Sequence, residues 1–359
     1  MTRPSRVVID KKALKHNLQR VREHAPNSKV MAIIKADAYG HGLVRVAKTL
    51  TDIDAFGVAC LEEAEQLRVA KITNPIVLLE GPHKAIDLPR IEQLQLDVVI
   101  HNEYQLEILE QIKLDEPLQA WIKIDTGMHR LGFAVNKVNA VLERVKNCSN
   151  LKQTPKLMTH FATANEQNNP LTQKQLEEFT QLCEGLDYEK TMANSAAIIN
   201  FPEAHVDWIR PGLMIYGVSP MKDGRADGHG LKPVMTLESE LISIQYLSKG
   251  DSVGYGATWS CPEDMPVGVV AAGYGDGFPR HAKPGTPILV NNVRCSLIGR
   301  ASMDMLTVDL RNQAEAKIGD RVVLWGETLP IEEVAQHADT IPYELMCGVH
   351  KRLEFVERG

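Results

Sequence analysis

The feature that most constrains the fold is a regular alternation of short apolar runs with amphipathic segments in the first two-thirds of the chain. Stretches such as 61–70, 102–112 and 171–182 place apolar residues three and four positions apart, with charged residues on the other face. Between them we predict eight strands, over residues 30–36, 55–59, 75–80, 97–100, 119–125, 156–161, 191–195 and 208–217. Continuous apolar runs indicate parallel strands buried on both faces. The pattern favours an α/β fold with an N-terminal (β/α)8 TIM-like barrel, and a doubly wound sheet is the alternative.

The pattern changes after residue 220. Residues 221–230 are polar and rich in glycine, which is typical of a linker or a surface loop. Apolar runs of strand length follow, separated by turn residues, and only 331–338 has a helical period. We therefore predict two domains, a barrel over residues 1–225 and a mostly β C-terminal domain over 226–359. The first few residues could also join the β domain.

Composition excludes several classes of function. A net charge of −6 without any long basic run argues against nucleic acid and anionic membranes as partners. No apolar stretch has the length of a signal peptide core or a membrane span. The six cysteines are far apart and lack C-x-x-C spacing, which indicates reduced thiols and no metal site. These features predict a cytoplasmic enzyme or binding protein.

Polar residues gather where the predicted barrel strands end. Lys35 follows the first strand, Lys123 lies in the fifth with Arg130 just beyond it, and His160 ends the sixth. Asn194 and Ser195 end the seventh strand, and Arg210 with Gly212 belongs to the eighth. The carboxyl ends of barrel strands form one rim, where functional groups of such barrels are found. Each residue alone is weak evidence, but together they predict an active site.

A lysine at an apolar barrel mouth loses hydration, which favours its neutral amine, and a neutral amine can form a Schiff base. The turn amides near Ser195 and Gly212, with the hydroxyls of Ser195 and Tyr39, are suitable phosphate ligands. A Schiff base beside a phosphate site suggests pyridoxal 5'-phosphate, which withdraws electrons from the α-carbon of an amino acid. Aldolases also combine a lysine with a phosphate site on such a barrel, so these residues alone leave both readings open.

Nine ordered motifs extend over nearly the whole chain: AIIKADAYGHG, IKIDTGMHRLGF, THFATA, ANSAA, WIRPGLMIYG, VGYGATW, GYGDG, ASMDML and YELMC. In this order they resemble the motifs of the alanine racemase family. The resemblance implies a pyridoxal-phosphate barrel followed by a β domain, and a two-base racemisation of L- and D-alanine that supplies D-alanine for peptidoglycan. Lys35 would carry the cofactor and act as one base, and Tyr255 would act as the other from the opposite face of the α-carbon. The resemblance places His160 beside Tyr255 and Arg210 beside His160, as a cationic relay.

The resemblance also assigns the remaining site residues. Arg210 would face the pyridine nitrogen, and because an arginine only donates hydrogen bonds, that nitrogen would stay unprotonated. Lys123 would be carbamylated and would position Arg130, which binds the cofactor and the substrate carboxylate. Met303 would bind that carboxylate through its backbone amide, and Tyr274 would narrow the access corridor. The remaining cofactor-binding residues implied by the family are Tyr39, Asn194, Ser195, Gly212, Leu213 and Tyr343.

In the family, the counterparts of Tyr255 and Met303 reach the active site of a partner subunit, so the resemblance implies a homodimer. Three positions depart from common family features: Ser302, Gly275 and the tail GVHKRLEF, which lacks an R-V-P ending. None of them is a proposed catalytic group. Three alternatives remain: a racemase of the same fold acting on serine or lysine, a pyridoxal-dependent decarboxylase, and a cofactor carrier without turnover. The decarboxylase predicts an acidic residue in place of Arg210, and the carrier predicts a single barrel.

Overall fold

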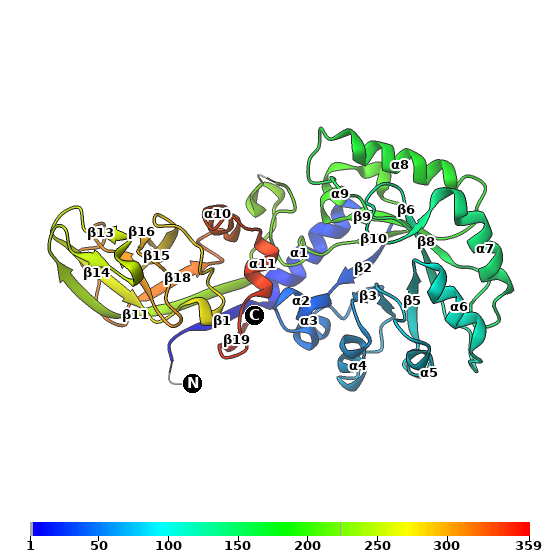
Figure 1. Cartoon of the computed structure of the whole chain (residues 1–359), viewed down its shortest axis with the longest axis horizontal. Helices are drawn as coiled ribbons and strands as arrows, with labels where there is room; N and C mark the ends of the chain where they lie inside the picture. Colours follow the sequence, from blue (N-terminus) through cyan, green and yellow to red (C-terminus); the bar gives the residue numbers. More distant parts are fainter. Residues whose placement is uncertain (1–2, 223) are drawn as a thin grey trace.

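The structure, a computed structural model, describes residues 3–222 and 224–359 and contains a barrel joined to an elongated β domain (Figure 1). Eight parallel strands form the barrel in the sequential order expected for this fold, and β5 pairs with β6 to close it. Their bounds are β2 Lys29–Ile33, β3 Ala55–Val58, β4 Ile76–Leu78, β5 Leu96–Ile100, β6 Ala120–Asp125, β8 Lys156–Met158, β9 Lys190–Asn194 and β10 Trp208–Arg210. Closure confirms the predicted barrel and excludes the doubly wound sheet.

Amphipathic helices cover the outside of the barrel. The helix α7 is representative, because Val138, Val141, Leu142 and Val145 form its buried face. Side chains of Asp10, Asn102 and Asn169 cap the amino ends of three helices. The helices are α1 Lys11–His24, α3 Leu43–Thr49, α4 Leu61–Val69, α5 Leu88–Gln93, α6 Glu103–Gln111, α7 Val138–Asn147, α8 Pro170–Leu182 and α9 Ser195–Asn200. The helices predicted from the periods at 61–70, 102–112 and 171–182 are confirmed as α4, α6 and α8.

Several predicted strands extend too far at their carboxyl ends; the strand predicted over 156–161 stops at Met158, and the last and the first barrel strands also stop early. The last barrel strand stops at Arg210, and residues 211–217 form turns instead of continuing the strand to 217. Pro211 cannot donate a ladder hydrogen bond, and Gly217 has a φ of 71°, so both residues oppose an extended strand. The first strand ends at Ile33, and Lys35 begins the short helix α2 Lys35–Tyr39. In both places the chain turns into the mouth of the barrel.

The C-terminal domain is built on an eight-stranded sheet with the order β14-β17-β16-β15-β18-β11-β1-β19. Its strands are β1 Arg6–Asp10, β11 Met235–Leu247, β14 Met265–Val270, β15 Pro287–Val290, β16 Val293–Ile298, β17 Leu306–Asp309, β18 Arg321–Trp325 and β19 Glu354–Arg358. The pairs are antiparallel except β1 with β19, which is parallel. The strand β1 therefore belongs to this sheet, where it pairs with β19 from the other end of the chain.

Smaller elements complete the fold. The short strands β12 Ser252–Val253 and β13 Trp259–Ser260 pair with each other, and β7 Phe133–Ala134 pairs with the end of β6. The helices α10 Ile331–His337 and α11 Pro342–Cys347 lie between the two sheets, and α11 packs against α2 (Figure 1). One cluster of buried apolar residues runs through both sheets. All six cysteines are free thiols. Among the described residues, no helix combines the length and the apolar character needed to cross a bilayer.

Candidate active site

A cavity of about 820 Å³ opens at the carboxyl ends of the barrel strands. Among the lining residues that the structure describes, Lys35, Lys123, Arg130 and Arg210 are cations, and Glu80 is the only carboxylate. This excess of positive charge favours an anionic ligand. Within residues 3–222 and 224–359, no group of three His, Cys, Asp or Glu side chains could hold a metal ion. The rim predicted from the sequence therefore surrounds one cavity.

Lys35 enters the cavity from an unusual backbone turn. The four residues from Ala36 to Tyr39 have φ values of 54°, 53°, 55° and 52°, so they form a left-handed turn. For residues other than glycine this conformation costs about 1–2 kcal/mol each. Side chains stabilise the turn: the Asp37 carboxylate accepts from the Leu43 amide at 2.7 Å, and Glu63 accepts from the Asp37 and Ala59 amides at 3.3 and 2.9 Å. Tertiary contacts thus hold Lys35 in place.

Arg210 is buried and uses its donors within the protein. Its guanidinium donates to the Thr191 hydroxyl at 2.6 Å and to the carbonyl oxygens of Thr159 and Met192 at 2.7 and 3.1 Å. It also donates to Nδ1 of His160 at 3.3 Å. Burial lowers the pKa of Arg210 to about 9, which is still above neutral pH. The residue therefore remains a cation that can only donate hydrogen bonds.

His160 is neutral in this site. Burial lowers the pKa of His160 well below its ordinary value, and the neighbouring cations Arg210, Lys123, Arg130 and Lys35 lower it further. Because Nδ1 accepts a hydrogen bond from Arg210, the ring proton belongs on Nε2. The positive charge of the predicted relay therefore lies on Arg210, and His160 can offer Nε2–H as a donor.

Lys123 is buried among other cations. Burial, followed by the charges of Arg210, Arg130 and Lys35, lowers the pKa of Lys123 to about 8. A substantial fraction of its amine is therefore neutral near physiological pH. A neutral amine is the form that reacts with electrophiles. Arg130 lies in the loop after β6 and lines the same cavity, although it is an exposed residue.

Another part of the cavity lining carries hydroxyl groups and loop amides of the kind that bind a phosphate. The Ser195 hydroxyl accepts from the Gly212 amide at 2.9 Å and from the Met214 amide at 3.3 Å, which ties the loop after β10 to the start of α9. A Cβ atom at Gly212 would lie 2.8 Å from the Tyr39 hydroxyl, so glycine is needed there for space. Burial raises the pKa of both Tyr39 and Tyr343, which keeps their hydroxyls protonated and able to donate. Asn194 and Leu213 complete this part of the lining.

Three residues suggested by the sequence do not line the cavity of their own chain. Tyr255, Tyr274 and Met303 lie in the C-terminal domain and are absent from the cavity wall. Tyr255, Tyr274 and Met303 are 68%, 38% and 54% exposed, respectively. The single chain therefore brings Lys35, Lys123, Arg130, His160 and Arg210 together, but it does not bring these three to them.

The structure adds site residues that sequence reasoning missed. Gln175 of α8 is fully buried; its amide donates to the His160 carbonyl at 3.1 Å and accepts from the Ala162 amide at 2.9 Å. The helix α11, whose Tyr343 the family resemblance already assigned to the site, also supplies Cys347 to the cavity, and Ile341 precedes the helix. Neither Cys347 nor Ile341 was predicted from the sequence as a site residue. Gln175 gave no signal beyond its place on an amphipathic helix.

Comparisons with known proteins agree with this architecture. Family models described as the N-terminal and C-terminal domains of alanine racemase match residues 9–220 and 234–357. An alanine racemase of Nitrosococcus oceani is 53% identical over 96% of this chain and 97% of its own length. The biosynthetic alanine racemase of Escherichia coli K12 is 49% identical over 97% of each chain. The crystal structure of the biosynthetic enzyme from Pseudomonas aeruginosa covers all of both chains with a TM-score of 0.97 at 43% identity. The chain therefore belongs to the alanine racemase family of isomerases.

Proposed function

We propose that this protein interconverts L- and D-alanine with pyridoxal 5'-phosphate, and thereby supplies D-alanine for peptidoglycan synthesis. The observation that carries the proposal is the cavity at the barrel mouth, where a lysine amine, a donor-only arginine and a phosphate cradle face one space. The relatives named above are alanine racemases, and two of them are described as biosynthetic. We further propose that the enzyme works in the cytoplasm and that its two domains meet near residue 225.

The residues of the cavity fit the cofactor. Lys35 would provide the amine for its aldehyde, Arg210 the donor for its ring nitrogen, and Arg130 a donor for its phenolic oxygen. The absence of a side chain at Gly212 lets its backbone approach the Tyr39 hydroxyl, and the hydroxyls of Tyr39, Ser195 and Tyr343 would bind the phosphate. When bound, pyridoxal phosphate supplies an electron sink for the bond broken at the α-carbon of alanine.

Arg210 limits the strength of this electron sink. Because Arg210 remains protonated, it would donate to the ring nitrogen and leave that nitrogen without a proton. A weaker electron sink would favour return of the proton to the α-carbon of alanine, and protonation at the wrong carbon, which leads to transamination, would be suppressed. A decarboxylase of similar architecture would require an acidic residue here, and the position is an arginine. The contacts of Arg210 with Thr159 and Met192 hold the guanidinium in this orientation.

Inversion of a stereocentre requires one group to remove a proton and another to supply one on the opposite face. Lys35 serves one face in this proposal, and Tyr255 of a partner subunit serves the other. The exposure of Tyr255 and Met303, away from the cavity of their own chain, supports their donation across a homodimer interface. The Nε2–H of His160 would stabilise the phenolate of Tyr255, supported by the nearby charge of Arg210.

A protonated Lys123 would repel Arg130, because both side chains are cations beside the same cavity. We propose that the Lys123 amine adds to carbon dioxide, loses one proton and becomes a carbamate. The pKa of about 8 leaves enough neutral amine for this addition. The resulting anion would orient Arg130 toward the substrate carboxylate, which the Met303 amide and the Tyr274 ring would approach from the partner subunit.

Purified protein reconstituted with pyridoxal phosphate tests the proposal. We expect yellow absorbance from the lysine-bound cofactor, interconversion of both alanine enantiomers, and solvent deuterium at the α-carbon of L-alanine incubated in D₂O. Alanine should be turned over in clear preference to serine and lysine. Cofactor binding without deuterium exchange would indicate a carrier, and release of carbon dioxide would indicate a decarboxylase. A preference for lysine would overturn the substrate assignment.

A further inference from the structure

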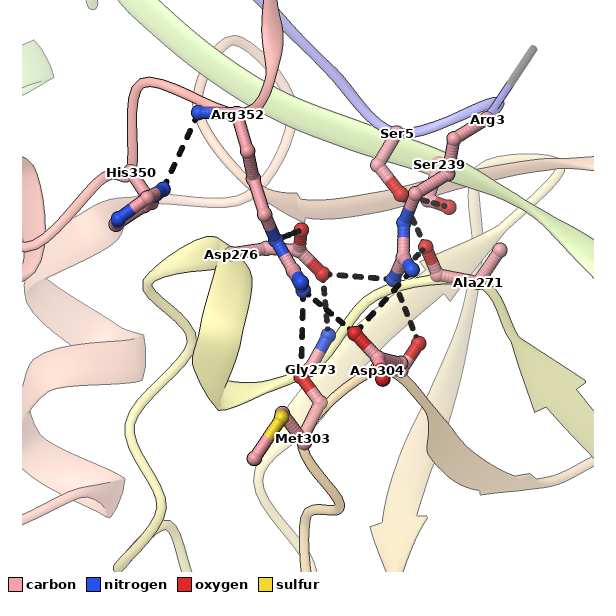
Figure 2. A network of polar contacts seen from close by, with 10 residues as sticks. All are labelled: Arg3, Ser5, Ser239, Ala271, Gly273, Asp276, Met303, Asp304, His350 and Arg352. Carbon is pink, nitrogen blue, oxygen red and sulfur yellow. Dashed lines mark hydrogen bonds and ion pairs between the residues drawn. The ribbon is translucent and has the colours of Figure 1, made fainter.

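We propose that Asp276 is a positioning residue that holds Tyr274 and Met303 at the substrate side of the partner's active site. This inference rests on the proposed function, in which these two residues act across a dimer interface. Asp276 lies in the loop after β14 and is fully buried (Figure 2). Arginines from opposite ends of the chain, Arg3 and Arg352, approach it from both sides.

Each oxygen of the Asp276 carboxylate has its own donors. Oδ2 accepts from Nη2 of Arg3 at 2.9 Å and from the Gly273 amide at 2.8 Å, and Oδ1 accepts from Nε of Arg352 at 2.8 Å. Arg3 precedes β1 and Arg352 precedes β19, which are neighbouring strands of the C-terminal sheet. The carboxylate therefore ties the loop that carries Tyr274 to both termini. A buried charge bound on all sides resists displacement, because every movement leaves a charge unpaired.

The same arginines bind the loop that carries Met303. Arg3 donates to the Asp304 carbonyl oxygen at 2.7 Å, and Arg352 lies 2.9 Å from the Asp304 carboxylate and 3.4 Å from the Met303 carbonyl oxygen. Figure 2 shows these contacts meeting between the two loops. Two arginines thus bind two carboxylates, so the cluster is balanced in charge. The cluster connects the Tyr274 loop and the Met303 loop to a single centre.

The two loops also bind each other directly through their backbones. The amide of Tyr274 donates to the Ser302 carbonyl oxygen at 3.0 Å, and the Gly275 amide donates to the Met303 carbonyl oxygen at 2.9 Å. A Cβ atom at Gly273 would overlap the Ser302 and Met303 carbonyl oxygens, so the close approach requires glycine. Arg352 would lie 2.8 Å from a Cβ atom at Gly275. These direct hydrogen bonds set the distance between the Tyr274 and Met303 backbones, and the cluster ties the joined loops to both termini.

Stability alone does not explain this arrangement, because the side chains that the cluster holds are exposed. The backbones of Tyr274 and Met303 are tied to a buried charge, while both side chains remain open to solvent. Rigid backbone beneath exposed apolar side chains is what a preorganised contact surface requires. The position of the Met303 amide and of the Tyr274 ring would then determine how well a substrate carboxylate and a small side chain fit.

The chain offers a matched control for the test. Glu238 is also a buried carboxylate between two arginines, Arg6 at 2.6 Å and Arg321 at 2.6 Å, but it lies within the sheet of β1, β11 and β18. Asp276→Asn and Glu238→Gln therefore make the same chemical change. A purely structural role predicts the same consequences for both variants.

Two measurements test the inference. In cofactor-free protein, we expect Asp276→Asn to accelerate amide hydrogen exchange in residues 272–278 and 301–305, and Glu238→Gln to leave these segments unchanged. In holoenzyme, we expect Asp276→Asn to raise the KM for alanine about tenfold and to raise the relative kcat/KM for serine, with a smaller change in kcat. Absorbance of the lysine-bound cofactor should not change, because Asp276 does not line the barrel cavity.

The inference is overturned if exchange in both segments is unchanged in Asp276→Asn, or if KM and selectivity match those of Glu238→Gln. Should Asp276→Asn fail to fold, Arg352→Gln removes one arginine from the cluster, and the same two measurements and the same criteria apply. Arg352→Lys, which retains the charge, should recover part of the effect. Failure of the proposed function is separately visible, because wild-type protein would then not racemise alanine at all.

Discussion

Nη2 of Arg210 lies 3.3 Å from Nδ1 of His160, so a buried cation and a neutral imidazole share one hydrogen bond at the barrel mouth. Arg210 keeps its proton near neutral pH, and His160 has its ring proton on Nε2. The positive charge of Arg210 can therefore act on His160 through their hydrogen bond without any transfer of a proton. In the proposed mechanism, this hydrogen bond would connect the residue that faces the cofactor ring nitrogen, Arg210, with the residue that stabilises the phenolate of Tyr255, His160.

We expect Arg210→Gln to reduce racemisation by about a hundredfold or more, since the amide lacks the positive charge that acts on the site. A larger share of turnovers should end as pyruvate, because the ring nitrogen would no longer be kept unprotonated by a cation. The carbonyl oxygens of Thr159 and Met192 would lose their donor, which costs about 1–3 kcal/mol each in stability. Pyruvate can be measured with a coupled dehydrogenase. Unchanged racemisation without pyruvate would contradict the assigned role.

Lys35→Ala should abolish both the absorbance of the lysine-bound cofactor and nearly all activity, because no other cavity residue presents an amine in the same place. The matched control is Lys48→Ala, at an exposed position of α3, which should retain both properties. Absorbance scans and an alanine racemisation assay on the two variants check this prediction. Activity that survives in Lys35→Ala would remove the amine from the mechanism.

Tyr255→Phe should keep the cofactor absorbance but lose most racemisation. Because the Tyr255 side chain is exposed, the free energy of unfolding should change by less than about 0.5 kcal/mol. Tyr246→Phe is the control, since Tyr246 is exposed in the same domain but lies on β11. Retained activity in both directions would show that the tyrosine is not a base.

Co-expression of the Lys35→Ala and Tyr255→Phe chains tests whether each site is shared between subunits. A mixed dimer would contain one site with an intact lysine and an intact tyrosine, and one site that lacks both. Random pairing should therefore restore about a quarter of wild-type activity from two nearly inactive chains. No restoration in mixed dimers, isolated with two different affinity tags, would place Tyr255 and Lys35 of the same chain in one site.

Lys123→Met should stabilise the cofactor-free protein at neutral pH when carbon dioxide is excluded. The pKa of Lys123 is about 8 in the folded state against an ordinary value of 10.5, so the folded state holds its proton less tightly than the unfolded state. The charged amine therefore destabilises the fold by about 3 kcal/mol below pH 8, and this penalty disappears as pH rises from 8 to above 10.5.

The measurement for Lys123→Met is a series of unfolding curves from pH 6 to pH 11. The advantage of the variant should be largest at the acidic end and should fade toward pH 11, where wild-type Lys123 is neutral in both states. Added bicarbonate should stabilise the wild type alone, because only an amine forms a carbamate. A stability difference that is independent of pH would contradict the burial of an uncompensated charge at this position.

Gly212→Ala should weaken cofactor binding, because the new Cβ atom would lie 2.8 Å from the Tyr39 hydroxyl in the phosphate cradle. We expect an increase of about tenfold or more in the dissociation constant of pyridoxal phosphate, measured by titration of the cofactor-free protein. Gly228→Ala is the control, since a Cβ atom there meets no other atom within 4 Å. Equal affinities in the two variants would show that the cradle lies elsewhere.

Much of the barrel could be predicted from periodicity. The apolar run 55–59, for example, contains the strand Ala55–Val58, because a strand buried on both faces has no polar position to interrupt it. The errors occur where the chain leaves the barrel strands. Residues 211–217 are buried although they form turns, and the Tyr216 hydroxyl donates to the Ile33 carbonyl oxygen at 3.0 Å. Apolar content alone cannot distinguish such a buried turn from a strand.

Local periodicity in the sequence was enough to predict the eight barrel strands, though not where each one ends, and motif order was enough to predict the family. The left-handed turn of residues 36–39, the place of β1 between β11 and β19, and the contribution of α11 to the cavity lining became visible only in the folded chain. These features depend on contacts between residues distant in the chain. Their stabilising free energy exists only once the surrounding elements have packed, so no local pattern encodes them.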